Sequence, residues 1–195
     1  MLISDREHDD FMLMLASGIH EAGHVLAARE FGFNVEWVSL DPDFLRSNPM
    51  AIENKCASGF PVTMTITSHL LTPIANRGCV TSRDEWETIR RYYIECHAGP
   101  LAEIHFNPHF QIEAGQRDFE QSDGLLWHLM KPDKFRFKRK RAAFIKDAQT
   151  FVEQHRNTIF YLGVEIHNRR TLFANEIDAA IAYAKEQAAS MKEAA

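Results

Sequence analysis

One stretch near the start of the chain constrains the fold most strongly, because it has the apolar spacing of a long helix. Acidic residues precede this stretch and Gly32 follows it. Acidic side chains suit the positive end of a helix dipole, and glycine commonly ends a helix. The pattern predicts a helix from Asp9 or Asp10 to Glu30. The apolar residues at helical intervals are Phe11, Leu15, Ile19, Leu26 and Phe31.

Two short segments after this helix predict a small sheet. Asn34 to Leu40 and Pro61 to Thr67 are rich in Val, Trp, Ile and Thr, and they alternate partly between apolar and polar residues. The stretch between them, Asp41 to Phe60, contains two prolines and no regular period. We therefore expect a loop between the two strands.

The remaining chain predicts further helices. Ser82, with Glu85 three residues later, has the form of a capping box, and the helix that it opens should end near Phe106. The expected fold class is mainly α, an α+β domain with a small β-sheet, in which residues 1–195 form a single domain. The later segments expected to be helical are Asp118 to Met130, a pair of segments from Ala142 to His167, and a last helix from Asn175.

Composition and charge narrow the class of protein. The chain has 195 residues and a net charge of −5, which suits one soluble globular domain and argues against nucleic acid as its partner. Cys56, Cys79 and Cys96 are far apart and odd in number, which indicates a reducing cytosol rather than a disulfide framework. The apolar run from Phe11 to Ala16 is too short for a membrane span, and the acidic start is unlike a targeting signal. We therefore expect a cytoplasmic protein that does not bind a membrane.

The predicted first helix carries the sequence His20-Glu21-Ala22-Gly23-His24. Residues four apart lie one above the other on a helix, so both imidazoles can bind the same metal ion. Glu21 is turned by about 100° from His20, which suits a general base rather than a ligand. Zinc held in this way makes a bound water acidic and polarises a carbonyl group, which is the chemistry of peptide hydrolysis. Gly23 costs about 1 kcal/mol relative to alanine in a helix, which indicates a close approach by another segment.

Two histidines leave such a site incomplete, since a catalytic zinc usually has three protein ligands and a water. Position 30 is Glu30, so the third histidine of the metzincin pattern is absent. The candidates by residue type are Glu103, Asp118, Glu120 and Asp123, together with the remaining histidines. Glu103 could instead support a ligand, because zinc-bound imidazoles commonly donate their second N–H to a carboxylate.

The helix sequence resembles the peptidase domain of the FtsH-type ATP-dependent metalloproteases, whose helix reads His-Glu-Ala-Gly-His. Ala98-Gly99-Pro100-Leu101-Ala102-Glu103 is similar to the Gly-Gly-Arg-x-Ala-Glu of that family. Gly115-Gln116-Arg117-Asp118-Phe119-Glu120-Gln121-Ser122 is similar to its Gly-Ala-Ser-Asn-Asp-Ile-Glu-Gln-Ala. The resemblance extends from His20 to Ile181 and implies a zincin-like helical fold. It assigns the third zinc ligand to Asp118, with Asp123 as the second choice.

The chain also departs from that family. It contains no G-x-x-x-x-G-K-[ST] phosphate loop, so we expect a peptidase domain without the ATPase module. Ala98 and Pro100 stand where the family has Gly and Arg. A separate ATPase or an adaptor is then a candidate partner, and a homo-oligomer is a further candidate.

The sequence therefore predicts a zinc-dependent metalloendopeptidase that acts on a peptide or unfolded protein. Zinc would be bound by His20, His24 and Asp118, with Glu21 as the base. The alternative is a non-catalytic module descended from a peptidase, in which zinc stabilises a protein- or peptide-binding surface. A stretch from Lys131 to Arg141 holds seven basic residues and one acidic residue. A solvated start of a helix is a simpler interpretation of this stretch than a contact surface for a partner.

Overall fold

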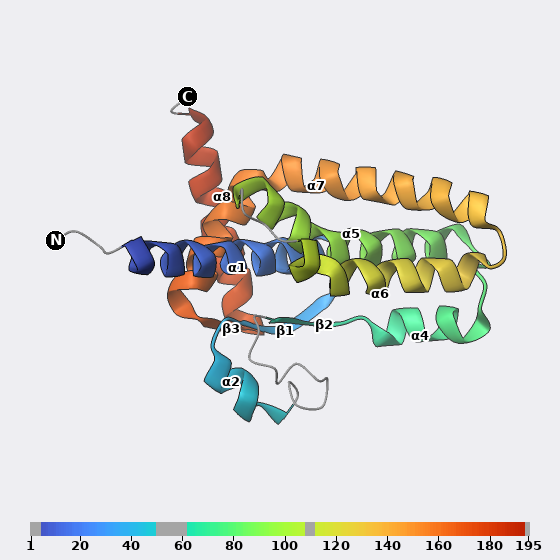
Figure 1. Cartoon of the computed structure of the whole chain (residues 1–195), viewed down its shortest axis with the longest axis horizontal. Coiled ribbons are helices and arrows are strands. Elements are labelled where there is room, and N and C mark those ends of the chain that lie inside the picture. The colour runs from blue at the N-terminus through green and yellow to red at the C-terminus, as the bar shows by residue number, and fades with distance from the viewer. Residues whose placement is uncertain (1–4, 50–61, 108–111, 194–195) are drawn as a thin grey trace.

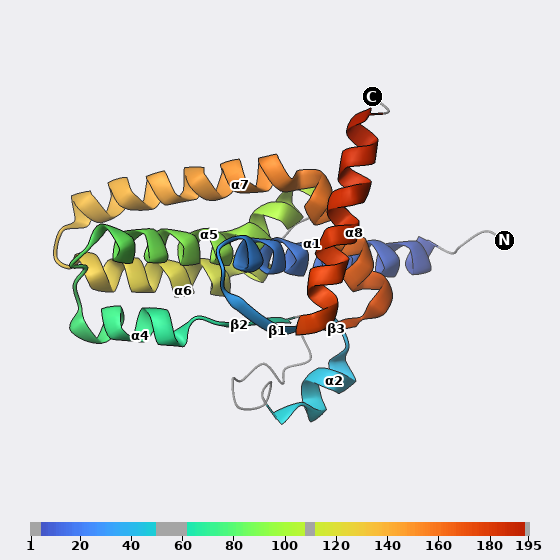
Figure 2. The same cartoon turned by 180° about the vertical axis from the view of Figure 1, so that it is seen from behind.

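The computed structural model describes residues 5–49, 62–107 and 112–193. Four helices, α1, α5, α6 and α7, run roughly along the long axis of the molecule, a small sheet lies beside α1, and α8 crosses the bundle (Figure 1 and Figure 2). The elements are α1 Asp5–Glu30, β1 Asn34–Ser39, α2 Pro42–Ser47, β2 Val62–Ile66, α4 Ser68–Arg77, α5 Arg83–Phe106, α6 Ile112–Met130, α7 Lys134–Arg169, β3 Thr171–Phe173 and α8 Ala174–Glu193. The prediction of a mainly helical fold with a small sheet is confirmed.

The first helix lies at the centre of the bundle and packs chiefly against α5 and α7. Glycine allows both close approaches, because a side chain at either position would collide with a neighbouring backbone. A Cβ on Gly18 would lie 2.6 Å from the carbonyl oxygen of Gly163 on α7, and one on Gly23 would lie 2.4 Å from the carbonyl oxygen of Ala98 on α5. The close approach predicted at Gly23 is therefore confirmed.

The sheet has the strand order β2-β1-β3, and both pairings are antiparallel. Val38 of β1 lies between Thr63 of β2 and Leu172 of β3. The strand β2 is thus an edge of the sheet, and it also contacts α1. This arrangement brings the threonines of β2 close to the helix that carries the two histidines.

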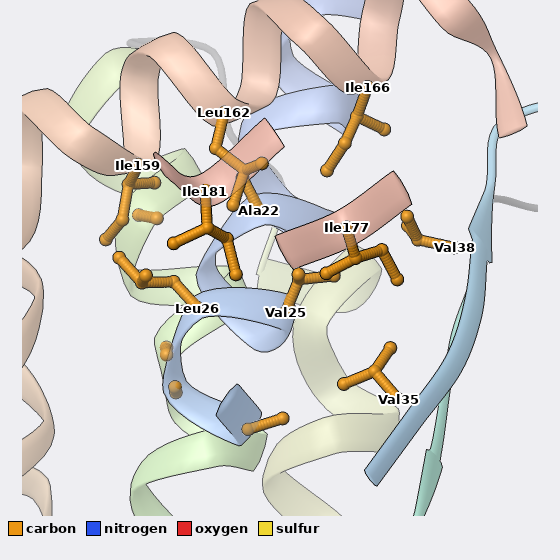
Figure 3. Close-up of a cluster of buried hydrophobic side chains, with 14 of the residues drawn as sticks. Ala22, Val25, Leu26, Val35, Val38, Ile159, Leu162, Ile166, Ile177 and Ile181 are labelled. Carbon is orange, nitrogen blue, oxygen red and sulfur yellow. The ribbon is translucent and has the colours of Figure 1, made fainter. Parts of the chain in front are cut away.

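The main hydrophobic core joins the two ends of the chain. Figure 3 shows Val25 and Leu26 of α1 facing Ile177 and Ile181 of α8, with Ile159, Leu162 and Ile166 of α7 above them. A second, smaller core lies between α4, α5, α6 and α7 and contains Ile74, Ile89, Tyr93, Leu126 and Phe144 among its buried residues. Burial of a large apolar side chain is worth roughly 1.5–3 kcal/mol, so these two cores set the relative positions of the helices.

Several predicted elements differ from those in the structure. The loop predicted from Asp41 to Phe60 contains the helix α2, because Asp41 caps it and Pro42 fits its first turn; residues 50–60 lie outside the described residues. The helices predicted as a pair from Ala142 form one helix that starts at Lys134, where Asp133 caps it. Its first turns are largely exposed, although Phe137 packs against Trp127 there. The helix α4 and the strand β3 were not predicted, and α6 begins at Ile112 rather than Asp118.

One helical stretch, Phe11–Glu30, is long and apolar enough to cross a membrane by length and composition. The core helices of soluble proteins pass the same test, and 61% of the most apolar 18-residue window in this stretch is buried inside the protein. The burial follows from the packing of α1 between α5, α7 and the sheet. The cytoplasmic location stays a prediction.

Candidate metal site

The two histidines of α1 and one aspartate of α6 converge on a single point. His20 Nε2 and His24 Nε2 are 3.1 Å apart, as expected for side chains one helical turn apart. Asp118 Oδ2 lies 3.4 Å from His20 Nε2 and 3.7 Å from His24 Nε2. Within the described ranges, these three side chains are the group whose ligand atoms are close enough to share a metal ion.

The dimensions of this triangle fit zinc. Tetrahedral zinc with bonds of about 2.0–2.1 Å places its ligand atoms roughly 3.3–3.4 Å from one another. The three observed separations of 3.1, 3.4 and 3.7 Å scatter around that value. Two imidazoles and one carboxylate are also a donor set that zinc accepts.

The second nitrogen of each ring has its own hydrogen-bond acceptor. His20 Nδ1 lies 2.9 Å from Glu103 Oε2, and His24 Nδ1 lies 2.8 Å from the backbone carbonyl oxygen of Glu95. When each Nδ1–H donates to its acceptor, each Nε2 presents a lone pair to the common point. Asn107 Nδ2 in turn donates to Glu103 Oε1 over 3.2 Å. The supporting role considered for Glu103 therefore matches its contacts.

The electrostatics of the site favour positive charge between these residues. Burial disfavours the charged form of His20, but the neighbouring carboxylates of Asp118 and Glu103 raise its pKa to about 10. Burial opposes charge on His24 as well, and Asp118 nevertheless raises its pKa to about 8. The two rings hold the pKa of Asp118 well below its usual range against the effect of its own burial. A divalent cation would replace the protons that the rings otherwise bind.

A glycine on α5 leaves space for the second histidine. A Cβ on Gly99 would lie 2.2 Å from His24 Nε2, which is well inside van der Waals contact. The side chain of His24, 9% exposed, therefore occupies space that any other residue at position 99 would fill. Together with the contact at Gly23, this places the α1–α5 crossing directly at the candidate site.

Two carboxylates next to the ligand triangle are bound by threonines of β2. Thr63 Oγ1 donates to Glu21 Oε2 over 2.7 Å, and Thr65 Oγ1 donates to Glu95 Oε1 over 3.3 Å. Glu21 and Glu95 are 4% and 7% exposed. Burial raises the pKa of Glu95, whereas the charge of His24 and the Thr65 hydroxyl oppose that rise.

The other ligand candidates have different surroundings. Asp123 accepts a hydrogen bond from the Tyr93 hydroxyl over 2.7 Å and from Arg141 Nε over 2.9 Å. It does not belong to the ligand triangle, and so its assignment as second choice has no support in the geometry. Glu120 is exposed and accepts a bond from Gln116.

Three other histidines have contacts unrelated to the triangle. His97 Nδ1 lies 3.0 Å from the carbonyl oxygen of Tyr93, and His128 Nε2 lies 3.0 Å from the carbonyl oxygen of Ala75. His105 is exposed and lies near Arg156.

The basic stretch from Lys131 to Arg141 forms the start of α7. Part of it is structural, because Arg141 pairs with Asp123 and the Lys140 ammonium lies 4.6 Å from the centre of the Trp86 ring. Phe135 is 79% exposed, and Phe137 packs against Trp127. These contacts agree with the helix start that the sequence favoured over a contact surface.

Sequence reasoning missed four residues of the site: Thr63, Thr65, Glu95 and Gly99. Alternate residues of a strand lie on the same face, so Thr63 and Thr65 could have been paired once β2 was assigned. Glu95, four residues before Gly99, lies on the same face of α5. No local signal indicated which helix face would meet His24.

The fold and the site define a mainly helical protein with a candidate metal centre between α1, α5 and α6. In comparisons with known proteins, no protein-family model and no curated protein matches the chain. The evidence for function is therefore the site itself.

Proposed function

We propose that the protein is a zincin-like zinc metallopeptidase, similar to the peptidase domain of FtsH-type proteases. The single observation that carries the proposal is the convergence of His20 Nε2, His24 Nε2 and Asp118 Oδ2 on one point, with both Nδ1 atoms held by other acceptors. Three protein ligands leave a fourth tetrahedral position for water or substrate, as in catalytic zinc sites. Asp118 is partly exposed, with 26% of its side chain accessible, whereas the side chains of His20 and His24 are 12% and 9% accessible.

Zinc at this site would polarise a carbonyl oxygen and make water acidic enough to ionise near neutral pH. Glu21 follows His20 directly, and its charge acts on both rings, since it raises the pKa of each. Glu21 would accept a proton from the attacking water and return it to the leaving amine. Thr63, which donates to Glu21, would hold the carboxylate in position for both transfers.

The proposal includes a peptide or unfolded protein as substrate and a cytoplasmic location. A separate ATPase or adaptor, or further copies of the chain, would present the substrate to the site. These parts of the proposal rest on the resemblance and on composition.

One observation favours the non-catalytic alternative, in which zinc stabilises a binding module. Glu21 is only 4% exposed, and one of its oxygens is bound by Thr63. A base that cannot reach a water molecule would leave the metal with a structural role. The behaviour of Glu21 therefore separates the two functions.

The test combines metal analysis with cleavage of an unfolded protein such as casein. We expect one zinc ion per chain, cleavage that a chelator abolishes, and a loss of about 10²–10⁴ in rate in Glu21→Gln with zinc still bound. Glu120→Gln, an exposed glutamate beside Asp118 in sequence, is the matched control and should keep full activity. Full activity of zinc-loaded Glu21→Gln would refute Glu21 as the base. Unfolding on chelation without cleavage under any condition would support the structural alternative.

A further inference from the structure

The third ligand of the candidate site lies on a helix that other helices must hold in place. Asp118 is on α6, whereas His20 and His24 are on α1. The helix α6 packs mainly against α5, with smaller contacts with α7 and α4. The distance from Asp118 to the imidazoles therefore depends on how α6 is attached to α5 and α7.

One carboxylate joins these three helices. Asp123 of α6 accepts a hydrogen bond from the hydroxyl of Tyr93 on α5 over 2.7 Å. The same carboxylate lies 3.0 and 2.9 Å, through its two oxygens, from Nε of Arg141 on α7. Tyr93 is fully buried at 0% exposure. Asp123 is turned by about 140° from Asp118 and displaced by roughly 7.5 Å along α6, so it faces α5 and α7 while Asp118 faces α1.

A second set of contacts one turn away holds the same register. The ring of His97 stacks on Tyr93 with ring centres 4.1 Å apart and contacts Phe119 at 4.8 Å. His97 Nδ1 also lies 3.3 Å from Ser122 Oγ, which itself bonds back to the carbonyl oxygen of Asp118 over 3.2 Å. Thus Tyr93 and His97, one turn apart on α5, both contact side chains of α6: Asp123 contacts Tyr93, and Phe119 and Ser122 contact His97.

We propose that Asp123 is a positioning residue for the metal centre, which fixes the rotation and height of α6 through Tyr93 and Arg141 so that Asp118 meets His20 and His24. The inference rests on the proposed zinc site. It assigns no metal ligand to Asp123; the carboxylate acts through Asp118. Loss of the Asp123 contacts should weaken zinc binding more than it weakens the fold.

The chain contains a matched control for this inference. Asp147 of α7 accepts from Arg90 Nε of α5 over 2.6 Å and therefore joins α5 to α7, whereas the Arg141 pair joins α6 to α7. Both ion pairs are partly exposed. Asp147→Ala removes a pair of similar geometry from the same bundle and leaves the Asp118 helix untouched.

The experiment measures zinc affinity by competition with a chromophoric chelator, together with the visible spectrum of the Co²⁺-loaded protein, which reports ligand number and geometry. We expect about tenfold weaker zinc binding and an altered Co²⁺ spectrum in Asp123→Ala, by analogy with losses on removing supporting contacts at metal sites. Asp147→Ala should change the affinity less than twofold and keep the wild-type spectrum. Tyr93→Phe, which removes only a hydroxyl, should give a smaller loss of about threefold and keeps the test valid if Asp123→Ala does not fold.

The outcomes distinguish the two proposals. The positioning role alone would be overturned if folded Asp123→Ala kept the zinc affinity and the Co²⁺ spectrum of the wild type. If Asp123→Ala does not fold, the same result in Tyr93→Phe would overturn it. Equal losses in Asp123→Ala and Asp147→Ala would also overturn it, because a general loss of bundle stability would then explain both. A wild-type chain that binds neither zinc nor Co²⁺ would overturn the proposed function, and the positioning role with it.

Discussion

Two polar clusters border α5, and both contain histidine and aspartate. The metal cluster contains His20, His24 and Asp118, and the second cluster contains His97 and Asp123. In the second cluster donors meet acceptors, as in the pairing of Asp123 with Tyr93 and Arg141. In the metal cluster the Nε2 atoms of two rings and a carboxylate oxygen meet each other.

The pKa values separate the two clusters in the same way. Burial lowers the pKa of His97 to about 4, whereas carboxylates raise those of His20 and His24 to about 10 and about 8 despite burial. A histidine held neutral by burial packs as an uncharged ring. A pair of histidines held positive by carboxylates marks a place where a cation is favoured. Residue type alone therefore does not identify a metal site, whereas the convergence of potential ligand atoms on one point does.

The largest expected effect comes from closing the space around His24. In Gly99→Ala the new methyl group would overlap the imidazole, since a Cβ would lie 2.2 Å from Nε2. We expect zinc affinity to fall at least about 100-fold and the free energy of unfolding to fall by about 1–3 kcal/mol from overpacking. Zinc titration and urea denaturation measure the two effects.

Gly124→Ala on α6 is the control for this substitution, because a Cβ there meets nothing within 4 Å. Alanine at this helical position should stabilise the protein by up to about 1 kcal/mol and leave zinc binding unchanged. Wild-type zinc affinity in Gly99→Ala would contradict the position of His24 in the site.

A second prediction concerns the opposite pH responses of the two clusters in the metal-free protein. His97 has a folded pKa of about 4 against an ordinary 6.5, so the unfolded chain binds the extra proton between these values and stability falls as the pH drops. The charges of Asp123 and Asp118 oppose this shift and that of Arg141 adds to it, but burial dominates. Between pH 7.5 and 5 the His97 ring should lower the free energy of unfolding by about 2 kcal/mol.

His20 and His24 act in the reverse sense. The stability that their charged forms contribute is fully present below pH 6.5 and is lost as the pH rises through about 8 and about 10.

Urea denaturation of metal-free wild type and His97→Phe across this pH range measures the difference. The variant keeps an aromatic ring to stack on Tyr93 but cannot titrate. We expect the variant to lose about 2 kcal/mol less than wild type between pH 7.5 and 5. Parallel curves for the two proteins would show that His97 is not held neutral by burial.

The smallest expected effect is at the edge of the metal cluster. Thr63→Val removes the hydroxyl that donates to Glu21 but keeps the shape of the side chain. Loss of a hydrogen bond to a charged group is worth about 1 kcal/mol or somewhat more, so kcat should fall about fivefold, with zinc affinity and KM unchanged. Thr63→Ser should restore kcat. A change in zinc affinity instead of kcat would place Thr63 in the support of the metal rather than of the base.

Much of the helical framework could be predicted from local signals. The apolar spacing of α1, the cap at Ser82 and the end of α5 at Phe106 all depend on residues close in sequence. The structure confirms both ends of α5 and the end of α1 at Glu30, whereas α1 begins at Asp5 rather than at Asp9 or Asp10. The helix α2 was missed because two prolines and the lack of an apolar period suggested a loop from Asp41 to Phe60, although Pro42 fits a first helical turn. No prediction was made for the segment of α4, which has Pro73 inside it. The strand β3 has only three residues and exists through its pairing with β1.

Local sequence was enough to predict the helix that places His20 and His24 one turn apart, with Glu21 turned by about 100° from His20, because that geometry follows from the repeat of an α-helix. The resemblance named Asp118, whereas residue type alone also left Glu103, Glu120, Asp123 and the remaining histidines as candidates. Only the tertiary structure brought Asp118 within 3.4 and 3.7 Å of the two rings and directed Glu103 to His20 Nδ1. These contacts depend on the rotation and spacing of α1, α5 and α6. That arrangement is set by the close packing at glycines, by the buried apolar side chains and by the contacts among Tyr93, Asp123 and Arg141.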